Sequence, residues 1–375
     1  MPDVPLTHNA TLSLPAHATT VVFSSVTSDL AVGSDDGSVR IYSSPYTKVK
    51  KAVRNLGETV SGLVFAGQSD SECLWIAAGR TLLQFRVDSE SKLILEKSDA
   101  MSSRTLGEDE EDALNDVAIN SAQTHVAMTS DSGEVYVLDV SSGDVKEMRT
   151  KHSNIAWKAA FIPKRINELV SGGYDCTLIH FDYRLGTLLS SFEIPPTPAL
   201  APGISTLPPF ITAMAISPSG VVATGTADGR IWVGAGGSKS STPSEKSSKS
   251  SKKARKWTGL DGNEGSMTKS FETMISDLLF LSPNQLLCCS VSGKLALYKL
   301  VPAIAIEPDL KPGQAGSKRQ ILQEIWATKC DAFEKVDKMA VICVQDGGAK
   351  QVAICGLGKD GKGLVQLWGE CREWE

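Results

Sequence analysis

Histidine, serine and the acidic residues are the side chains with which this chain of 375 residues could do catalytic or metal chemistry. Only five histidines occur, and none stands in a His-Glu-x-x-His or His-x-x-Glu-His arrangement, the zinc-binding patterns of metalloproteases. No Gly-x-Ser-x-Gly turn is present to expose a nucleophilic serine. We therefore predict a protein that is not an enzyme and that holds no cofactor and no metal ion.

The eight cysteines are scattered along the chain without a Cys-x-x-Cys pair. Several lie in apolar runs typical of buried strands, which favours free thiols in a reducing compartment over disulfides or a metal site. No run approaches the roughly 18 apolar residues of a membrane span. The first residues lack the basic and apolar regions of a signal peptide. These features predict a protein of the cytoplasm, the nucleus or both, without a membrane partner.

The segment Phe181-Asp182-Tyr183-Arg184 is the first candidate for a binding function. An arginine presents five donors on a planar fork and can bind a carboxylate or carbonyl groups of another protein. The alternative is local, with Asp182 capping a turn and Arg184 pairing with it. Asp182 and Arg184 are therefore our candidates for a protein-binding edge.

Residues 235–258 form an insertion rich in Ser, Gly and Lys, with seven basic residues and one acidic residue in a chain of net charge −5. This composition buries too little apolar surface to fold, so we expect a disordered loop. It can act as a nuclear localisation signal, a patch for an anionic partner or a phosphorylated switch, or it is only a tolerated insertion. The candidate localisation signal consists of Lys252, Lys253, Arg255 and Lys256.

Two further loops have a distinct composition. The Pro-rich segment Pro195–Pro209 is either a polyproline II ligand or a stiff connector. The acidic segment Glu108–Asp112 either binds a basic peptide or is a solvated loop. Because the chain outside the basic insertion is acidic, we do not expect its body to bind nucleic acid.

The elements that must position these residues recur along the chain as short apolar runs separated by polar turns. Runs such as Leu30–Gly33 are apolar on both faces, as in sheets that stack face to face. A recurring unit of about 40 residues with four short strands is typical of a propeller blade, and longer steps hold the loop insertions. We predict one domain over residues 1–375, an all-β, seven-bladed β-propeller with four antiparallel strands per blade. The turns of the seven units are Asp36, Gly79, Ser132, Asp175, Asp228, Ser292 and Asp346.

The two ends of the chain leave the closure of the ring open. We predict that the seventh unit begins with the strand Glu324–Lys329. The N-terminal run Leu12–Leu14 can complete the last blade beside the C-terminal strands, and Leu364–Trp368 competes for that place.

These repeats resemble the WD40 family over nearly the whole chain. A blade of that family has Gly-His before its first strand, Ser or Thr in the second, Asp at the turn and Trp-Asp at the end of the third. The fourth unit fits best, with His152, Ser171, Asp175 and Phe181-Asp182. The resemblance implies that His152, Ser171, Asp175 and Phe181 form a structural network, from which Phe181 removes the indole donor.

Residues 181–184 are also similar to the Trp-Asp-x-Arg box of WD40 substrate receptors for cullin-4 ubiquitin ligases. That resemblance implies a monomeric, non-catalytic scaffold whose Asp182 and Arg184 face the ligase adaptor, while the opposite rim binds a client. One alternative is a scaffold of another nuclear complex, in chromatin or RNA processes, which the basic insertion favours. The other is an enzyme on a propeller, for which the sequence offers no cluster of catalytic groups.

Overall fold

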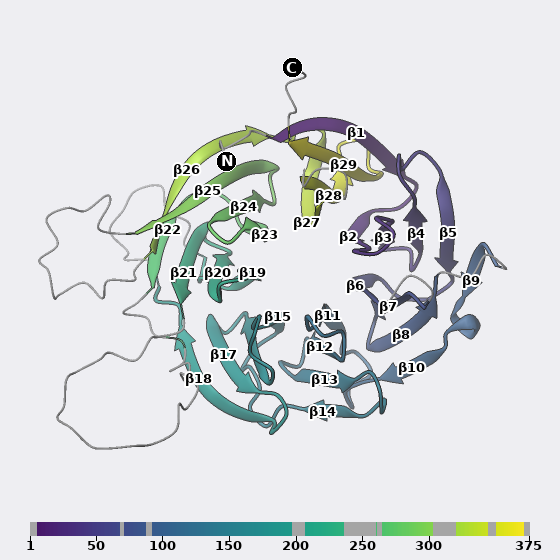
Figure 1. The fold of residues 1–375 in the computed structure, drawn as a ribbon, viewed down its shortest axis with the longest axis horizontal. Coiled ribbons are helices and arrows are strands. Elements are labelled where there is room, and N and C mark those ends of the chain that lie inside the picture. Colours follow the sequence, from purple (N-terminus) through teal and green to yellow (C-terminus); the bar gives the residue numbers. More distant parts are fainter. Residues whose placement is uncertain are drawn as a thin grey trace, which may run out of the picture.

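The computed structural model describes residues 6–67, 71–87, 92–196, 207–235, 260, 265–302, 320–343 and 350–370. Within these ranges the chain forms seven sheets, antiparallel apart from one short outer strand, arranged in a ring (Figure 1). Residues of all seven blades line a cavity at the centre of the ring, which we call the channel. The predicted all-β, seven-bladed propeller is confirmed. The basic insertion, its candidate localisation signal and most of the Pro-rich loop lie outside the described residues.

The blades follow one another along the chain, and the first strand of each lies nearest the channel (Figure 1). Blade 1 holds β2 (Ala18–Phe23), β3 (Leu30–Ser34), β4 (Val39–Tyr42), β5 (Val49–Arg54) and β9 (Ile94–Glu96); blade 2 holds β6 (Val60–Ala66), β7 (Cys73–Ala78), β8 (Thr81–Arg86) and β10 (Ser102–Thr105); blade 3 holds β11 (Leu114–Ile119), β12 (His125–Ser130), β13 (Val135–Asp139) and β14 (Val145–Glu147). Blade 4 holds β15 (Ala156–Phe161), β16 (Glu168–Gly173), β17 (Thr177–Asp182) and β18 (Thr187–Glu193); blade 5 holds β19 (Ile211–Ile216), β20 (Val221–Thr226), β21 (Arg230–Ala235) and β22 (Ser266–Lys269); blade 6 holds β23 (Ile275–Ser282), β24 (Gln285–Ser290), β25 (Lys294–Pro302) and β26 (Gln320–Lys329); blade 7 holds β27 (Phe333–Cys343), β28 (Lys350–Gly358), β29 (Gly363–Glu370) and β1 (Leu6–Leu14).

Blade 1 departs from the four-stranded pattern. The short strand β9 leaves blade 2 and pairs in parallel with β5 of blade 1, from Ala52 opposite Ile94 to Arg54 opposite Glu96. A single 3₁₀ turn, Lys97–Asp99, then leads back to β10 in blade 2. The connection therefore ties two neighbouring blades together at their outer edges.

The N-terminal strand closes the ring. β1 pairs antiparallel with β29, from Leu6 opposite Glu370 to Leu14 opposite Gly363. The run Leu364–Trp368 belongs to β29, the third strand of blade 7, and Leu12–Leu14 belongs to the fourth strand of the same blade. The two runs therefore do not compete, and the proposed closure by Leu12–Leu14 is confirmed.

The predicted frame of the seventh unit is wrong by one strand. Glu324–Lys329 lies in β26, the fourth strand of blade 6, and blade 7 begins with β27. Asp346 falls between the first and second strands of that blade, outside the described residues, while the turn between the second and third strands lies at 359–362. The frame shifts because the N-terminus supplies the fourth strand, so the C-terminal segment needs only three.

The core is divided among the seven blade interfaces. Seven clusters of buried apolar side chains occur in the described ranges, and each joins one pair of neighbouring blades. The residues at the position of the family's Trp all point into such clusters; they are Tyr42, Phe85, Leu138, Phe181 and Tyr298. Both faces of each sheet are thereby covered, which explains why the inner strands are apolar throughout.

The first strands are joined to one another around the channel. Each carries a β-bulge near its start, where two residues of the first strand lie opposite one residue of the second strand. At three bulges a polar side chain donates a hydrogen bond to a carbonyl of the next blade: Thr19 to Val60, Asn115 to Ala156 and Thr212 to Ile275. At these bulges polar side chains therefore link neighbouring blades by hydrogen bonds.

Four charged side chains from blades 3, 4, 6 and 7 meet between these first strands. Lys338 Nζ lies 3.0 Å from Asp116 Oδ1, and Lys158 Nζ lies 3.5 Å from Asp116 and 4.0 Å from Asp277. Burial acts to raise the pKa of Asp116, but the two ammonium groups outweigh it and lower that pKa. For Asp277 burial prevails and raises the pKa. We call these four residues the channel tetrad.

Candidate functional site

The strand order gives the ring two distinct faces. Face 1 carries the connections between first and second strands and between third and fourth strands, such as 162–167 and 183–186 in blade 4. Face 2 carries the connections between second and third strands and those between blades, such as 174–176 and 148–155. The residues selected from the sequence divide between these two faces.

His152, Ser171 and Asp175 meet on the face 2 side of blade 4. His152 Nδ1 lies 2.9 Å from Asp175 Oδ1, and His152 Nε2 lies 2.7 Å from Ser171 Oγ. This is the order of contacts in a catalytic serine triad, in which His bridges Asp and Ser. Ser171 lies in the middle of β16 with no exposed surface, and His152 is 1% exposed, so no substrate carbonyl can reach the hydroxyl. The trio therefore holds the loop before β15 against the turn after β16.

Phe181 lies apart from this trio. Its ring has no exposed surface and packs in the cluster between blades 3 and 4, with Ala156 and Leu169. A phenyl ring carries no N–H donor, so the hydrogen-bonded trio ends at Ser171 and Phe181 contributes packing alone.

Replacing Asp175 by Asn should lower the free energy of unfolding by about 1–3 kcal/mol at neutral pH. Burial acts to raise the pKa of Asp175, but the hydrogen bond and charge of His152, with two backbone donors, outweigh it and lower the pKa. A lowered carboxyl pKa stabilises the fold above the unfolded value near 3.9, and this contribution is lost as the pH falls through the folded-state pKa. Urea unfolding of both proteins between neutral and acid pH would measure it.

The matched control for this change is Glu334→Gln, which neutralises an exposed carboxylate at the start of β27. We expect a change within about 0.5 kcal/mol for it at any pH. A constant difference between wild type and Asp175→Asn down to acid pH would contradict the assigned role of the carboxylate.

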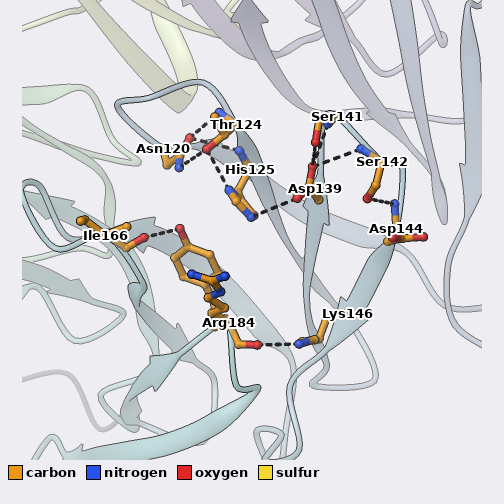
Figure 2. Close-up of polar contacts among 11 residues, drawn as sticks. Asn120, Thr124, His125, Asp139, Ser141, Ser142, Asp144, Lys146, Ile166 and Arg184 are labelled. Carbon is orange, nitrogen blue, oxygen red and sulfur yellow. Dashed lines mark hydrogen bonds and ion pairs between the residues drawn. The ribbon is translucent and has the colours of Figure 1, made fainter.

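Asp182 and Arg184 lie on face 1, at the turn after β17. Asp182 Oδ1 accepts a hydrogen bond of 3.0 Å from the backbone N–H of Leu185, so the turn is capped as one alternative proposed. The other half of that alternative does not occur, since no ion pair joins Arg184 to Asp182 within the described structure. Arg184 is exposed, and in the described part of the chain only its backbone carbonyl is engaged, by Lys146 Nζ at 2.5 Å (Figure 2). Its guanidinium is therefore available to a partner.

Arg184 borders a groove between blades 3 and 4 with a volume of about 660 Å³. The loops that line it are 120–125 and 139–146 of blade 3 and 161–167 and 183–184 of blade 4. Tyr183, the residue between the two candidates, forms its floor: it contacts Phe161 edge to face at 5.2 Å and His125 at 5.0 Å between ring centroids. The Tyr183 hydroxyl donates to the carbonyl of Ile166, which fixes the ring in place.

Polar contacts within blade 3 set the opposite wall of the groove. Asp139 accepts hydrogen bonds from the backbone and hydroxyl of Ser141 and from the backbone of Ser142 (Figure 2). These donors, Ser141 first, lower the pKa of Asp139. His125 Nδ1 contacts Thr124 Oγ1 at 2.9 Å, and that oxygen also receives the amide of Asn120. The wall is thus held by local contacts that leave no free pair of nucleophile and base.

None of the groove residues other than Tyr183 and Arg184 was selected from the sequence. They come from four loops of two blades, and the sequence of each loop by itself is that of an ordinary polar turn. The only signal available was Arg184 itself, because its neighbours are determined by the register of blades 3 and 4. The acidic segment gives the opposite result: Asp112 is 8% exposed and accepts two hydrogen bonds from Ser132, so its last carboxylate is used inside blade 3.

A phosphate-loop resemblance occurs at 356–361, which spell Gly-x-Gly-x-x-Gly and are followed by Lys362 and Gly363. Such a loop needs to lead from a strand into a helix whose N-terminus binds the phosphate. Here the segment ends β28 and turns into β29, so no helix follows. Gly363 also stands where a phosphate loop has Ser or Thr, and a side chain there would collide with the carbonyl of Ala16. The segment is a hairpin and not a nucleotide site.

Two findings concern the described part of the chain as a whole. No cluster of three or more His, Cys, Asp or Glu side chains there is placed to hold a metal ion. No helix in the described ranges is long and apolar enough to cross a membrane.

Comparison with known proteins agrees with the repeat. The family model "WD domain, G-beta repeat" matches residues 9–43. That stretch runs from the outer strand of blade 7 through the three inner strands of blade 1, so the sequence repeat spans the point where the ring closes. The chain is also 25% identical over 160 residues to a WD repeat-containing protein 53 homolog of Dictyostelium discoideum. That match covers 41% of this chain and 40% of the relative.

A propeller of this kind is consistent with a scaffold for protein interactions, since a rigid ring presents loops for contact. The resemblance to the WD40 family, drawn from repeats over nearly the whole chain with the fourth unit as the best fit, is confirmed. This protein thus carries a WD40 repeat within a seven-bladed β-propeller and is similar to WD repeat-containing proteins.

Proposed function

We propose that this protein is a non-catalytic scaffold that serves as a substrate receptor or adaptor of a cullin-4-type E3 ubiquitin ligase in the cytoplasm, the nucleus or both. The observation that carries the proposal is the exposed, unpaired guanidinium of Arg184 within the 181–184 segment, at the rim of a groove. The departure of this segment from the ligase-receptor box lies at Phe181, which is fully buried. The two residues that a partner can reach, Asp182 and Arg184, are those that the box has.

Face 2 is the proposed client side. A second cavity, of about 520 Å³, opens there at the mouth of the channel and receives residues from all seven blades. Trp157 and Tyr174 lie 5.2 Å apart at this mouth, and Tyr174 stacks on Phe210 at 5.3 Å. Half-exposed aromatic side chains are favoured at protein interfaces. A scaffold with one partner on each face would hold a client opposite the ligase.

Replacing Arg184 by Ala should remove the cullin-4 adaptor from material that co-purifies with the tagged protein. The side chain is exposed and has no described partner, so the fold should keep its melting temperature while the contact is lost. Affinity purification followed by mass spectrometry would compare wild type, Arg184→Ala and the control Arg54→Ala, an exposed arginine at the end of β5 in blade 1. The proposal fails if the adaptor never accompanies the wild-type protein.

A further inference from the structure

The groove on face 1 has an excess of positive charge. Four basic side chains and two acidic ones line it, in a chain whose net charge is −5; the basic ones are Lys146, Lys164, Arg165 and Arg184, and the acidic ones are Asp139 and Asp144. The net charge of the chain, from 38 basic and 43 acidic residues, therefore has the opposite sign to that of the groove. A local reversal of sign of this kind selects a partner by electrostatic complementarity.

The internal contacts of the groove increase this excess. Asp139 already accepts three hydrogen bonds from its own turn and faces His125 Nε2 at 3.7 Å. On the basic side, Arg165 is paired with Glu168 at 3.6 Å, but Lys164 and Arg184 are exposed and make no ion pair among the described residues. The backbone of Lys164 has φ at +65°, a conformation that is strained for a lysine. This conformation turns the chain at the tip of the loop. Two uncompensated cations therefore stand on two adjacent loops of blade 4.

Apolar side chains accompany the charges. Ile166, which is 85% exposed, lines the groove, and Leu185, which is 62% exposed, follows Arg184 in the turn beside it. Below them the ring of Tyr183 and the edge of Phe161 form an apolar floor. A purely ionic ligand would leave these surfaces in water, whereas a peptide with both acidic and apolar side chains would cover them.

We infer that this groove binds an extended, acidic segment of a partner protein, in which Asp or Glu residues flank a large apolar side chain. The carboxylates bind Arg184 and Lys164, and the apolar side chain rests against Ile166, Leu185 and the Tyr183 floor. This inference rests on the proposed function and specifies the chemistry of the adaptor surface that Arg184 would meet. The cavity volume of about 660 Å³ lies within the range of pockets that enclose a small molecule, so the groove has room for a large side chain.

The test uses the full chain and short fluorescent peptides, read by anisotropy at low and physiological salt. The probes are a Glu-rich peptide with a central Leu, the same peptide with Gln for Glu, the same with Lys for Glu, and a phosphoserine version. The Glu peptide should bind at least about tenfold more tightly than the Gln peptide, and salt should weaken it. Arg184→Glu and Lys164→Glu should each weaken it by about tenfold or more, whereas the double change Ile166→Ala with Leu185→Ala should weaken it with little effect on the salt dependence.

The control is Arg54→Glu, which changes the net charge by the same amount in blade 1. The inference is overturned if this control weakens binding as much as Arg184→Glu, if the Lys peptide binds as tightly, or if only the phosphoserine peptide binds. It is also overturned, and the proposed function kept, if the Arg184-dependent adaptor co-purifies but no acidic peptide binds. Binding of the Glu peptide without a co-purifying adaptor would support the groove chemistry and reject the ligase role.

Discussion

Replacing Asp116 by Ala is expected to lower the free energy of unfolding by about 3–5 kcal/mol, the cost of breaking a buried ion pair by removing one partner. Asp116 is 8% exposed and, among the described residues, is the only acid within 4 Å of both ammonium groups of the channel tetrad. Without it, Lys338 keeps only the carbonyl of Ser61 at 3.0 Å, and Lys158 keeps Asp277 at 4.0 Å. The buried ammonium of Lys158 and the partly buried ammonium of Lys338 would then share the more distant carboxylate of Asp277. Equilibrium unfolding in urea measures the loss.

A double variant separates the charge effect from packing. Asp116→Leu combined with Lys338→Met leaves one cation, Lys158, with one carboxylate, Asp277, and should recover most of the stability lost by Asp116→Ala. The control is Asp331→Ala, which breaks an exposed ion pair. The side chain of Lys329 in that pair is 64% exposed, and that of Asp331 is 74% exposed. It should change the stability by less than about 0.5 kcal/mol. A loss below about 1 kcal/mol for Asp116→Ala would show that solvent in the channel already screens the tetrad.

The contacts of the channel tetrad could not be predicted from the sequence. Asp116, Lys158, Asp277 and Lys338 occupy corresponding places in their own blades, because each directly follows a bulge in the first strand. No short stretch of sequence shows that these residues meet, because their contacts join different blades across the ring. Asp116 and Lys338, for example, are 222 residues apart in sequence. The repeat itself was readable, since every blade has the same run of apolar strands and polar turns. Interactions across the ring depend on its closure, which has no local signal.

The candidate site divides in the same way. The hydrogen bonds of His152 lie within one blade and match the pattern that the fourth unit displays in sequence. The exposure of Arg184 follows from its position after a third strand, which the repeat predicts. The groove beside it could not be foreseen, because it combines loops of blades 3 and 4 whose spacing is determined by the packing of Phe181 and Tyr183 between them. Its excess of basic charge is likewise a property of two blades together.

The frame of the last blade shows a third limit. Six units could be aligned along the chain in order, but the seventh borrows β1 from the other end. β1 is recognisable as a strand by its alternation: Ala10, Leu12 and Leu14 face inward while Thr11 and Ser13 are exposed. Alternation gives the strand its faces but not its partner. The partner of β1 is β29, because the C-terminal segment supplies only three strands of blade 7 and leaves the outer edge of β29 free.

Removing residues 1–14 should therefore cost more than any single substitution, because it opens the ring. β29 would lose its outer neighbour along the ladder from Leu6 opposite Glu370 to Leu14 opposite Gly363. Leu6 and Leu14, 3% and 1% exposed, would leave the clusters on the two sides of blade 7. At about 1.5–3 kcal/mol for each buried leucine, with the ladder in addition, the loss approaches the whole stability of a domain, about 5–15 kcal/mol. The truncated chain should lose its cooperative thermal transition and aggregate through the exposed strand edge.

Complementation in trans distinguishes ring opening from a general effect of truncation. A synthetic peptide of residues 6–14 should restore a cooperative transition, because it can pair with β29 and fill both clusters. The same peptide with Leu6→Asp and Leu14→Asp should not, since a carboxylate at either position would be buried without a partner. In the intact chain Leu14→Ala should cost about 2–5 kcal/mol, whereas Ser13→Ala on the exposed side of the strand should change stability by less than about 0.5 kcal/mol. A truncated protein that melts cooperatively near the wild-type temperature would mean that blade 7 is stable with three strands, and the closure by β1 would then be dispensable for the fold.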